Sequence, residues 1–308
     1  MKSNFILILL GVAFLGILEA CNRKQPAEKA YSDTYTSGDL KVVSDESFAP
    51  IIDQEIYIFK NDNPKANPIL SYGTENSIVN QLLKDSVEMA FLSRDLTNDE
   101  RAVLTQHNQY AQVSKFAVDA VAIIVNQAAA DTAVTVDQIK KMLRGEAGTD
   151  RNLVFDNPNS SLVRYLKDLT DQKEFNLKNI YALKSNKEVI KYVASNPKAI
   201  GIIGFSWIDD PDADYAGDAK KVKILAVGDS IKKQGVTQYF RPSQTSLYLK
   251  QYPLHRSLYV VNCTGRKGLG AGLELFVKGD KGQRIILRSG LLPFIIPGRE
   301  ITIHSDKL

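Results

Sequence analysis

The sequence has few of the residues from which metal sites and disulfide frameworks are built. Its three histidines, His107, His255 and His304, lie far apart and show no metal-ligand spacing. It has two cysteines, Cys21 and Cys263, which are too few for a zinc site or a disulfide framework. Cys263 ends an apolar run and is expected to be a buried small apolar residue. We therefore expect no metal.

Catalytic motifs and strong charge are also absent. The sequence contains no G-x-S-x-G elbow and no Walker loop, and the glycines of residues 268–272 lack the third glycine of a dinucleotide fingerprint. Residues 209–214 are acidic but lack the glycine and terminal glutamate of a calcium loop, which predicts a solvated surface loop. With 39 basic and 35 acidic residues, the net charge of +4 is too mild for a nucleic-acid binder. We expect neither catalysis nor a cofactor.

The N-terminus indicates export. Lys2 precedes an apolar run over residues 5–18, and Ala20 stands just before Cys21. This pattern is typical of a secretory signal peptide, predicted over residues 1–20. The run is shorter than the roughly 18–20 residues of a membrane span. The cysteine after the cleavage point resembles a bacterial lipobox, with Glu19 in place of its small or apolar residue. Cys21 would then carry a lipid in the cell envelope; the alternative is an ordinary signal peptide.

Residues 21–37 are polar and predict a flexible tether, because they cannot bury enough apolar surface to offset ordering. About 270 residues remain, which is more than one core usually organises, so two lobes are expected.

The remaining sequence alternates short apolar runs with helical periodicity, which predicts an α/β fold with mixed, mostly parallel sheets. Helix starts are marked by the capping pairs Thr97–Glu100, Thr135–Gln138 and Ser185–Glu188, and by Ser47 with Pro50 in the first turn. The predicted strands are residues 39–44, 69–72, 87–92, 118–126, 152–155, 199–205, 222–227 and 257–263. The predicted helices begin near residues 47, 75, 97, 135, 161, 185, 269 and 283.

Four turns of this pattern follow a strand, precede a helix and carry hydroxyl or amide groups: residues 47–48, 74–75, 93–94 and 157–161. A helix start leaves backbone N–H groups without partners and so favours anions. For any single turn, the alternative is an ordinary helix cap. Arg94 could hold an oxyanion through two parallel hydrogen bonds, or it could be a surface arginine paired with Asp95 or Asp99.

Four segments resemble the phosphate-binding component of bacterial ABC uptake systems, a type II periplasmic binding protein. They are residues 47–50 (Ser-Phe-Ala-Pro), residues 87–100, residues 159–161 (Asn-Ser-Ser) and residues 268–293. The resemblance spans residues 38–296. It implies two lobes with a cleft between them: residues 38–120 with 256–308 form lobe 1, and residues 121–255 form lobe 2.

The resemblance implies a monomeric solute-binding lipoprotein that captures inorganic phosphate and delivers it to an ABC permease. Glu75 is not expected to take part, because a carboxylate facing an anion is repulsive. The implied phosphate ligands are Ser47, Phe48, Thr74, Ser93, Arg94, Asn159, Ser160 and Ser161.

The chain departs from the family at two charged positions. Arg94 stands where the family has an aspartate that accepts the proton of phosphate, and Phe155 stands where it has an arginine. Asp95 or Asp156 could replace the acceptor, and the choice between phosphate and sulfate stays open. One alternative function is a cell-surface interaction or signalling protein that uses the same fold without tight anion binding. A secreted hydrolase is a third, with no catalytic constellation behind it.

Overall fold

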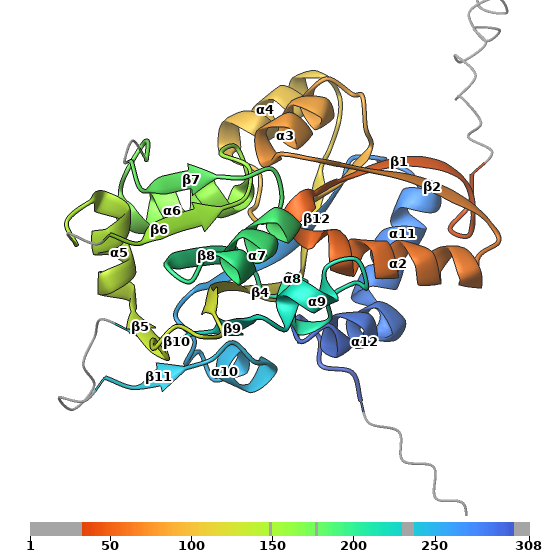
Figure 1. Cartoon of the computed structure of the whole chain (residues 1–308). Helices are drawn as coiled ribbons and strands as arrows, with labels where there is room; N and C mark the ends of the chain where they lie inside the picture. Colours follow the sequence, from red (N-terminus) through yellow and green to blue (C-terminus); the bar gives the residue numbers. More distant parts are fainter. Residues whose placement is uncertain (1–32, 148–149, 176–177, 230–236, 299–308) are drawn as a thin grey trace, which may run out of the picture. The chain divides into compact units, whose positions relative to one another are not determined.

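The computed structural model describes residues 33–147, 150–175, 178–229 and 237–298, and it has the expected α/β architecture (Figure 1). The strands are β1 (Ser37–Asp45), β2 (Lys65–Gly73), β3 (Met89–Leu92), β4 (Gln112–Asn126), β5 (Ala133–Thr135), β6 (Asn152–Phe155), β7 (Ile180–Ala182), β8 (Ala199–Gly204), β9 (Val222–Ile224), β10 (Ala226–Gly228), β11 (Tyr239–Phe240), β12 (His255–Asn262) and β13 (Leu292–Pro293). The helices are the 3-10 turn η1 (Glu46–Phe48), α2 (Ala49–Asp62), α3 (Glu75–Leu83), α4 (Asn98–Gln106), α5 (Val136–Arg144), α6 (Ser161–Thr170), α7 (Asn186–Ser195), α8 (Ser206–Asp209), α9 (Ala216–Ala219), α10 (Gln244–Tyr248), α11 (Leu269–Lys278) and α12 (Asp280–Arg288).

The main sheet has the strand order β2-β1-β3-β12-β4-β8-β6-β7, with β13 and β9 also paired to β4. The outer pairs β1–β2, β1–β3, β6–β7 and β6–β8 are parallel. The central strands β12 and β4 run antiparallel to each other, and they are antiparallel to β3 and β8 respectively. The sheet is therefore mixed, as expected, but parallel pairing is confined to its outer parts, because the two central strands carry the chain in opposite directions.

Strand β4 changes partners along its length. Its residues up to Ala120 pair with β12 and β13, and its residues from Val121 pair with β8 and β9. The change falls at the predicted boundary between residues 120 and 121, and β12 begins next to the predicted return at residue 256. We use the names lobe 1 and lobe 2, with their predicted bounds, for the described residues on either side of this boundary. The division into two lobes stays a prediction.

The helices cover the sheet through apolar faces. Helices α2, α11 and α12 contact one another, and α2 and α11 also contact β1 (Figure 1). In lobe 2, α7 packs on β8, all of whose residues are buried. Gly201 permits this close approach, because a Cβ atom there would lie 2.7 Å from Ile124 Cγ1 and 2.8 Å from Val193 Cγ2.

The predicted helix starts are mostly confirmed. Thr97 and Thr135 form complete capping boxes. Ser185 caps α7 by accepting from the Glu188 amide. The prediction that Ser47 caps its helix is wrong: the carboxylate of Asp45 caps η1 by accepting from the Ser47 amide at 2.8 Å.

Other predictions differ in extent. The strand expected over residues 222–227 is divided into β9 and β10, which pair with β4 and β5 respectively. Residues 33–37, at the end of the predicted tether, are already structured: the Asp33 carboxylate accepts from the Leu269 amide at 3.0 Å. Cys263 is buried, as expected. The signal peptide and Cys21 lie outside the described residues.

Among the residues with described positions, no helix is both long and apolar enough to cross a bilayer.

Candidate functional site

The first predicted turn joins β1 to α2 and is buried between the lobes. Ser47 and Phe48 are 1% and 0% exposed. The backbone carbonyl of Ser47 accepts a hydrogen bond from the indole N–H of Trp207 in lobe 2, at 3.0 Å. The Ser47 hydroxyl is buried and has no hydrogen-bond partner among the described residues. Trp207 thus packs directly against the predicted site.

An arginine that sequence reasoning missed connects this turn to lobe 2. Arg256, in β12, is 5% exposed, and its Nη1 donates to the hydroxyl of Ser161 at 3.0 Å. Its guanidinium carbon lies 4.8 Å from the centre of the Phe48 ring, a cation–π contact. Its Nε donates to Asp119 at 2.9 Å. The signal that could have found it is an arginine placed directly before the predicted strand of residues 257–263.

The loop before α6 carries the second-lobe residues of the prediction. Ser161 is fully buried, Ser160 is 6% exposed, and Asn159 is exposed. The Ser160 hydroxyl caps α6 by accepting from the Val163 amide, and it donates to the carboxylate of Asp156 at 2.5 Å. Ser160 therefore has an ordinary capping role whatever else it does.

Asp156 is a perturbed acid beside this loop. Its pKa is raised to about 7, chiefly by burial and also by the nearby Asp45 and Glu46, while the hydrogen bond from Ser160 and the charge of Arg256 oppose the shift. The other suggested proton acceptor, Asp95, is exposed and pairs with Arg101. Of the two, only Asp156 is a buried carboxyl next to the loop.

The second and third predicted turns meet at a carboxylate. Glu75, 2% exposed, accepts from the Ser93 hydroxyl at 3.0 Å and from Arg94 Nε at 2.9 Å. Arg164 of lobe 2 donates from Nε to the same Glu75 carboxylate at 2.6 Å and from Nη2 to Ser93 at 2.9 Å. The Glu75 carboxylate is therefore paired with two arginines of the protein. That Glu75 is not itself a phosphate ligand stays a prediction. Thr74 is half-buried at the start of α3 and makes no capping bond there.

Arg94 is held within lobe 1. Its Nη1 and Nη2 donate to the Glu100 carboxylate at 2.8 Å each, and Nη1 also donates to the Asp95 carbonyl at 2.9 Å. The hydrogen bond to Glu100 raises the pKa of Arg94 and lowers that of Glu100. The alternative of a surface pair with the carboxylate of Asp95 or Asp99 is wrong, because its carboxylate partners are Glu75 and Glu100.

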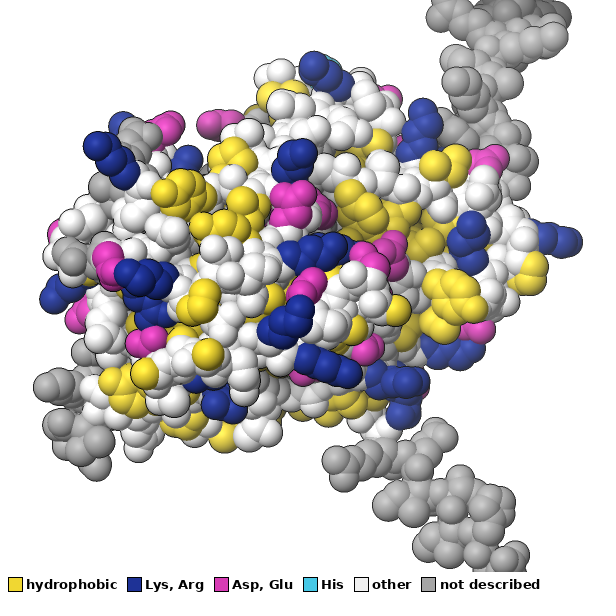
Figure 2. Space-filling view, viewed as in Figure 1, with side chains coloured by type: hydrophobic (Ala, Val, Ile, Leu, Met, Phe, Trp, Pro, Cys, Tyr) yellow, Lys and Arg dark blue, Asp and Glu magenta, His cyan; other side chains and the backbone are white. Residues whose placement is uncertain are grey.

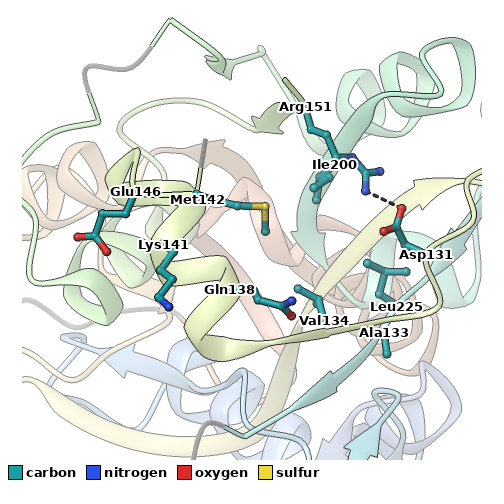
Figure 3. A pocket seen from close by; sticks show the side chains of 11 residues that line it. Asp131, Ala133, Val134, Gln138, Lys141, Met142, Glu146, Arg151, Ile200 and Leu225 are labelled. Atoms are coloured by element: carbon teal, nitrogen blue, oxygen red, sulfur yellow. Dashed lines mark hydrogen bonds and ion pairs between the residues drawn. The ribbon is translucent and has the colours of Figure 1, made fainter. Parts of the chain in front are cut away.

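A hollow of about 130 Å³ lies between the lobes at this cluster. Neither Ser47 nor Arg94 lines it. A larger hollow, about 450 Å³, lies within lobe 2 and is lined by none of the predicted residues (Figure 3). Apolar side chains such as Met142 and Ile200 line it, with an Arg151–Asp131 pair beside them. We place the candidate site at the small hollow and Arg256, because the donors suited to a small anion gather there. The small hollow is lined by Glu75, Asn76, Pro158, Asn159, Ser160, Arg164 and Lys167.

Within the described part of the chain, no group of three or more His, Cys, Asp or Glu residues could hold a metal ion. The acidic loop that superficially resembles a calcium site is instead tied to Lys187, which lies 3.3 Å from Asp212 and 3.0 Å from Asp214. On the face shown in Figure 2, basic and acidic side chains are interspersed.

Comparisons with known proteins agree with the predicted fold. A sequence model of the PBP superfamily domain matches residues 29–278. The chain is 26% identical over 307 residues to the phosphate-binding protein PstS of Borreliella burgdorferi, covering 93% of this chain and 98% of that protein. It is 25% identical over 316 residues to PstS of Bacillus subtilis, covering 95% and 94%.

Solved structures show the same fold. A Clostridium perfringens protein solved with bound phosphate superposes with a TM-score of 0.68 at 19% identity, over 84% of this chain and 100% of that chain. An ABC-type phosphate transport receptor from Vibrio cholerae gives a TM-score of 0.62 at 19% identity, over 83% and 100%. The predicted fold class is therefore confirmed. Since the family match extends over more than half of its length, the chain belongs to the PBP superfamily.

Proposed function

We propose that this protein is an extracytoplasmic solute-binding protein that captures phosphate, or a similar tetrahedral oxyanion, for an ABC importer. Its membership of the PBP superfamily and its similarity to two proteins named phosphate-binding protein PstS support this function. Its binding would be non-covalent and reversible, and it would act as a transport receptor and not as an enzyme.

The observation that carries the proposal is that arginine side chains join the predicted turns of lobe 1 to lobe 2. The Ser47–Phe48 turn and Ser161 both contact Arg256. The Ser93 turn contacts Arg164. Helix starts, hydroxyls and guanidinium groups gathered between the lobes form an environment rich in hydrogen-bond donors, which suits an oxyanion stripped of water.

The proposed ligand set is the predicted one: hydroxyls of Ser47, Thr74, Ser93, Ser160 and Ser161, the Phe48 amide, the Asn159 amide group and the Arg94 guanidinium. Asp156 is the better of the two suggested acceptors for the proton of hydrogen phosphate, because it is buried beside the loop and its pKa is raised by burial to about 7. A group that titrates near neutral pH can exchange a proton with hydrogen phosphate.

The test is calorimetric titration of the purified protein with phosphate and with sulfate, with Trp207 fluorescence as a second readout. We expect micromolar or tighter phosphate binding that Ser161→Ala weakens, because Ser161 is the buried first residue of α6. The matched control is Ser243→Ala, a capping serine of α10 in lobe 2 that lies outside the proposed site. Absence of heat with every oxyanion would remove the proposal.

We also propose attachment to the cell envelope through a lipid on Cys21, outside the described residues. The test is labelling with a fatty-acid analogue in the producing bacterium. Label should be lost in Cys21→Ala and kept in Cys263→Ala. Label kept in Cys21→Ala would indicate that the lipid is elsewhere and that the first residues are an ordinary signal peptide.

A second candidate, an interaction protein without tight anion binding, is favoured by one observation. Glu75 already occupies the donors of Ser93, Arg94 and Arg164, as an external anion would. If the wild-type protein binds no oxyanion but the Glu75→Gln variant does, the Glu75 carboxylate is what prevents anion binding. The interaction function would then be favoured over phosphate capture.

A further inference from the structure

We propose that Arg256, which is outside the predicted ligand set, supplies the cation that holds the oxyanion, and that Asp119 tempers its charge. The proposal rests on the proposed function and names the charge-bearing group of that same site.

Arg256 lies where the two lobes and the two crossing strands meet. It stands opposite Asp119 in the register of β12 with β4. From there its side chain reaches Phe48 of lobe 1 and Ser161 of lobe 2. A ligand held by this guanidinium would contact both lobes at once, which is what stabilises a closed arrangement.

The Arg256 guanidinium still has donor capacity. Its Nη2 lies 2.9 Å from Asp119 Oδ2, but in a geometry that makes no hydrogen bond, so this buried nitrogen is without a hydrogen-bond partner among the described residues. The Ser47 hydroxyl is buried and unpartnered as well. Buried donors without acceptors are unfavourable, and an oxyanion would satisfy them.

The two unpartnered groups belong to one small region. A Cβ atom placed on Gly204 would lie 3.2 Å from the Ser47 carbonyl oxygen and 3.4 Å from Arg256 Nη2. Both residues therefore approach the same glycine, and a side chain at this position would crowd them. The cations at the other cluster differ, because Arg94 and Arg164 are both hydrogen-bonded to Glu75.

Asp119 is buried completely and pairs with Arg256 from the side away from Ser161. An arginine in such an ion pair still offers N–H donors, but the pair carries little net charge. A bound dianion therefore gains less electrostatic stabilisation than it would from an isolated arginine. Removing the Asp119 charge should therefore strengthen anion binding, whereas removing the Arg256 charge should weaken it.

The experiment measures the phosphate Kd of the purified protein by calorimetry, for the wild type, Arg256→Gln, Arg256→Lys and Asp119→Asn. We expect Arg256→Gln to weaken binding by about 10- to 100-fold, the value of a charged hydrogen bond. Arg256→Lys should fall between, and Asp119→Asn should bind several-fold more tightly. The control is Arg101→Gln, which removes a cation from the Asp95 pair near the surface and should leave the Kd unchanged.

Circular dichroism establishes which variants are folded. If Arg256→Gln does not fold, Arg256→Lys and Asp119→Asn decide the question. The proposal would be overturned if folded Arg256→Gln bound phosphate with wild-type affinity, or if Asp119→Asn weakened phosphate binding as much as Arg256→Lys does. The Arg256–Asp119 pair would then only stabilise the contact between the two crossing strands. A wild type that binds neither phosphate nor sulfate would overturn the proposed function, and with it this assignment.

Discussion

The Glu75 cluster lends itself to a quantitative prediction, because one carboxylate holds two arginines and a serine across the lobes. The change is Glu75→Gln, which keeps the shape of the side chain and removes its charge. Arg94 and Arg164 would then face a neutral amide, while Arg94 keeps its bonds to Glu100 and Arg164 keeps Asp168 and the Ser93 hydroxyl as acceptors.

The size of the effect follows from burial. Removing one partner of a fully buried ion pair costs about 3–5 kcal/mol. Here Glu75 is 2% exposed, but Arg94 and Arg164 are 22% and 33% exposed and keep Glu100 and Asp168 as second partners. We therefore expect a loss of about 1–3 kcal/mol in the free energy of unfolding. For a domain of this size that lowers Tm by roughly 2–12 °C.

The assay is urea denaturation with a parallel thermal scan at low phosphate. The matched control is Asp168→Asn, which removes an exposed partner of Arg164 on the same helix and should change stability by less than about 0.5 kcal/mol. Equal effects of Glu75→Gln and Asp168→Asn, or a stabilised Glu75→Gln, would refute the reasoning that a buried carboxylate holds the lobes together.

Three further outcomes are expected. Arg94→Ala should weaken phosphate binding in calorimetry, and an unchanged Kd would remove Arg94 from the proposed site. Asp156 has a folded pKa of about 7, raised by burial above the ordinary value of 3.8, so its contribution to stability is present below pH 4 and lost as pH rises toward 7. Asp156→Asn should therefore flatten the pH dependence of urea denaturation between pH 4 and 7, and an unaltered slope would contradict the shift. Gly201→Ala should destabilise by about 1–3 kcal/mol in the same assay, because its Cβ would meet Ile124 and Val193; unchanged stability would mean that α7 can move away from β8.

Local chemistry made most of the secondary structure predictable. The capping boxes at Thr97 and Thr135 and the apolar runs in β4 and β8 need only neighbouring residues, because periodicity and caps act within a few positions of the chain. The same argument failed at Ser47, where Asp45 is the cap, because two acceptors stand close together and sequence does not rank them.

The sequence by itself therefore determined the α/β alternation and the turns that carry hydroxyls. Only the tertiary structure decided how charges are paired. Glu75 seemed repulsive until Arg164, 89 positions away, was brought beside it. Arg256 was not among the predicted ligands, and only the fold brings it beside Asp119, Phe48 and Ser161. The physical reason is that caps are local, whereas the pairing of a buried charge depends on which distant residues the fold brings within a few ångströms.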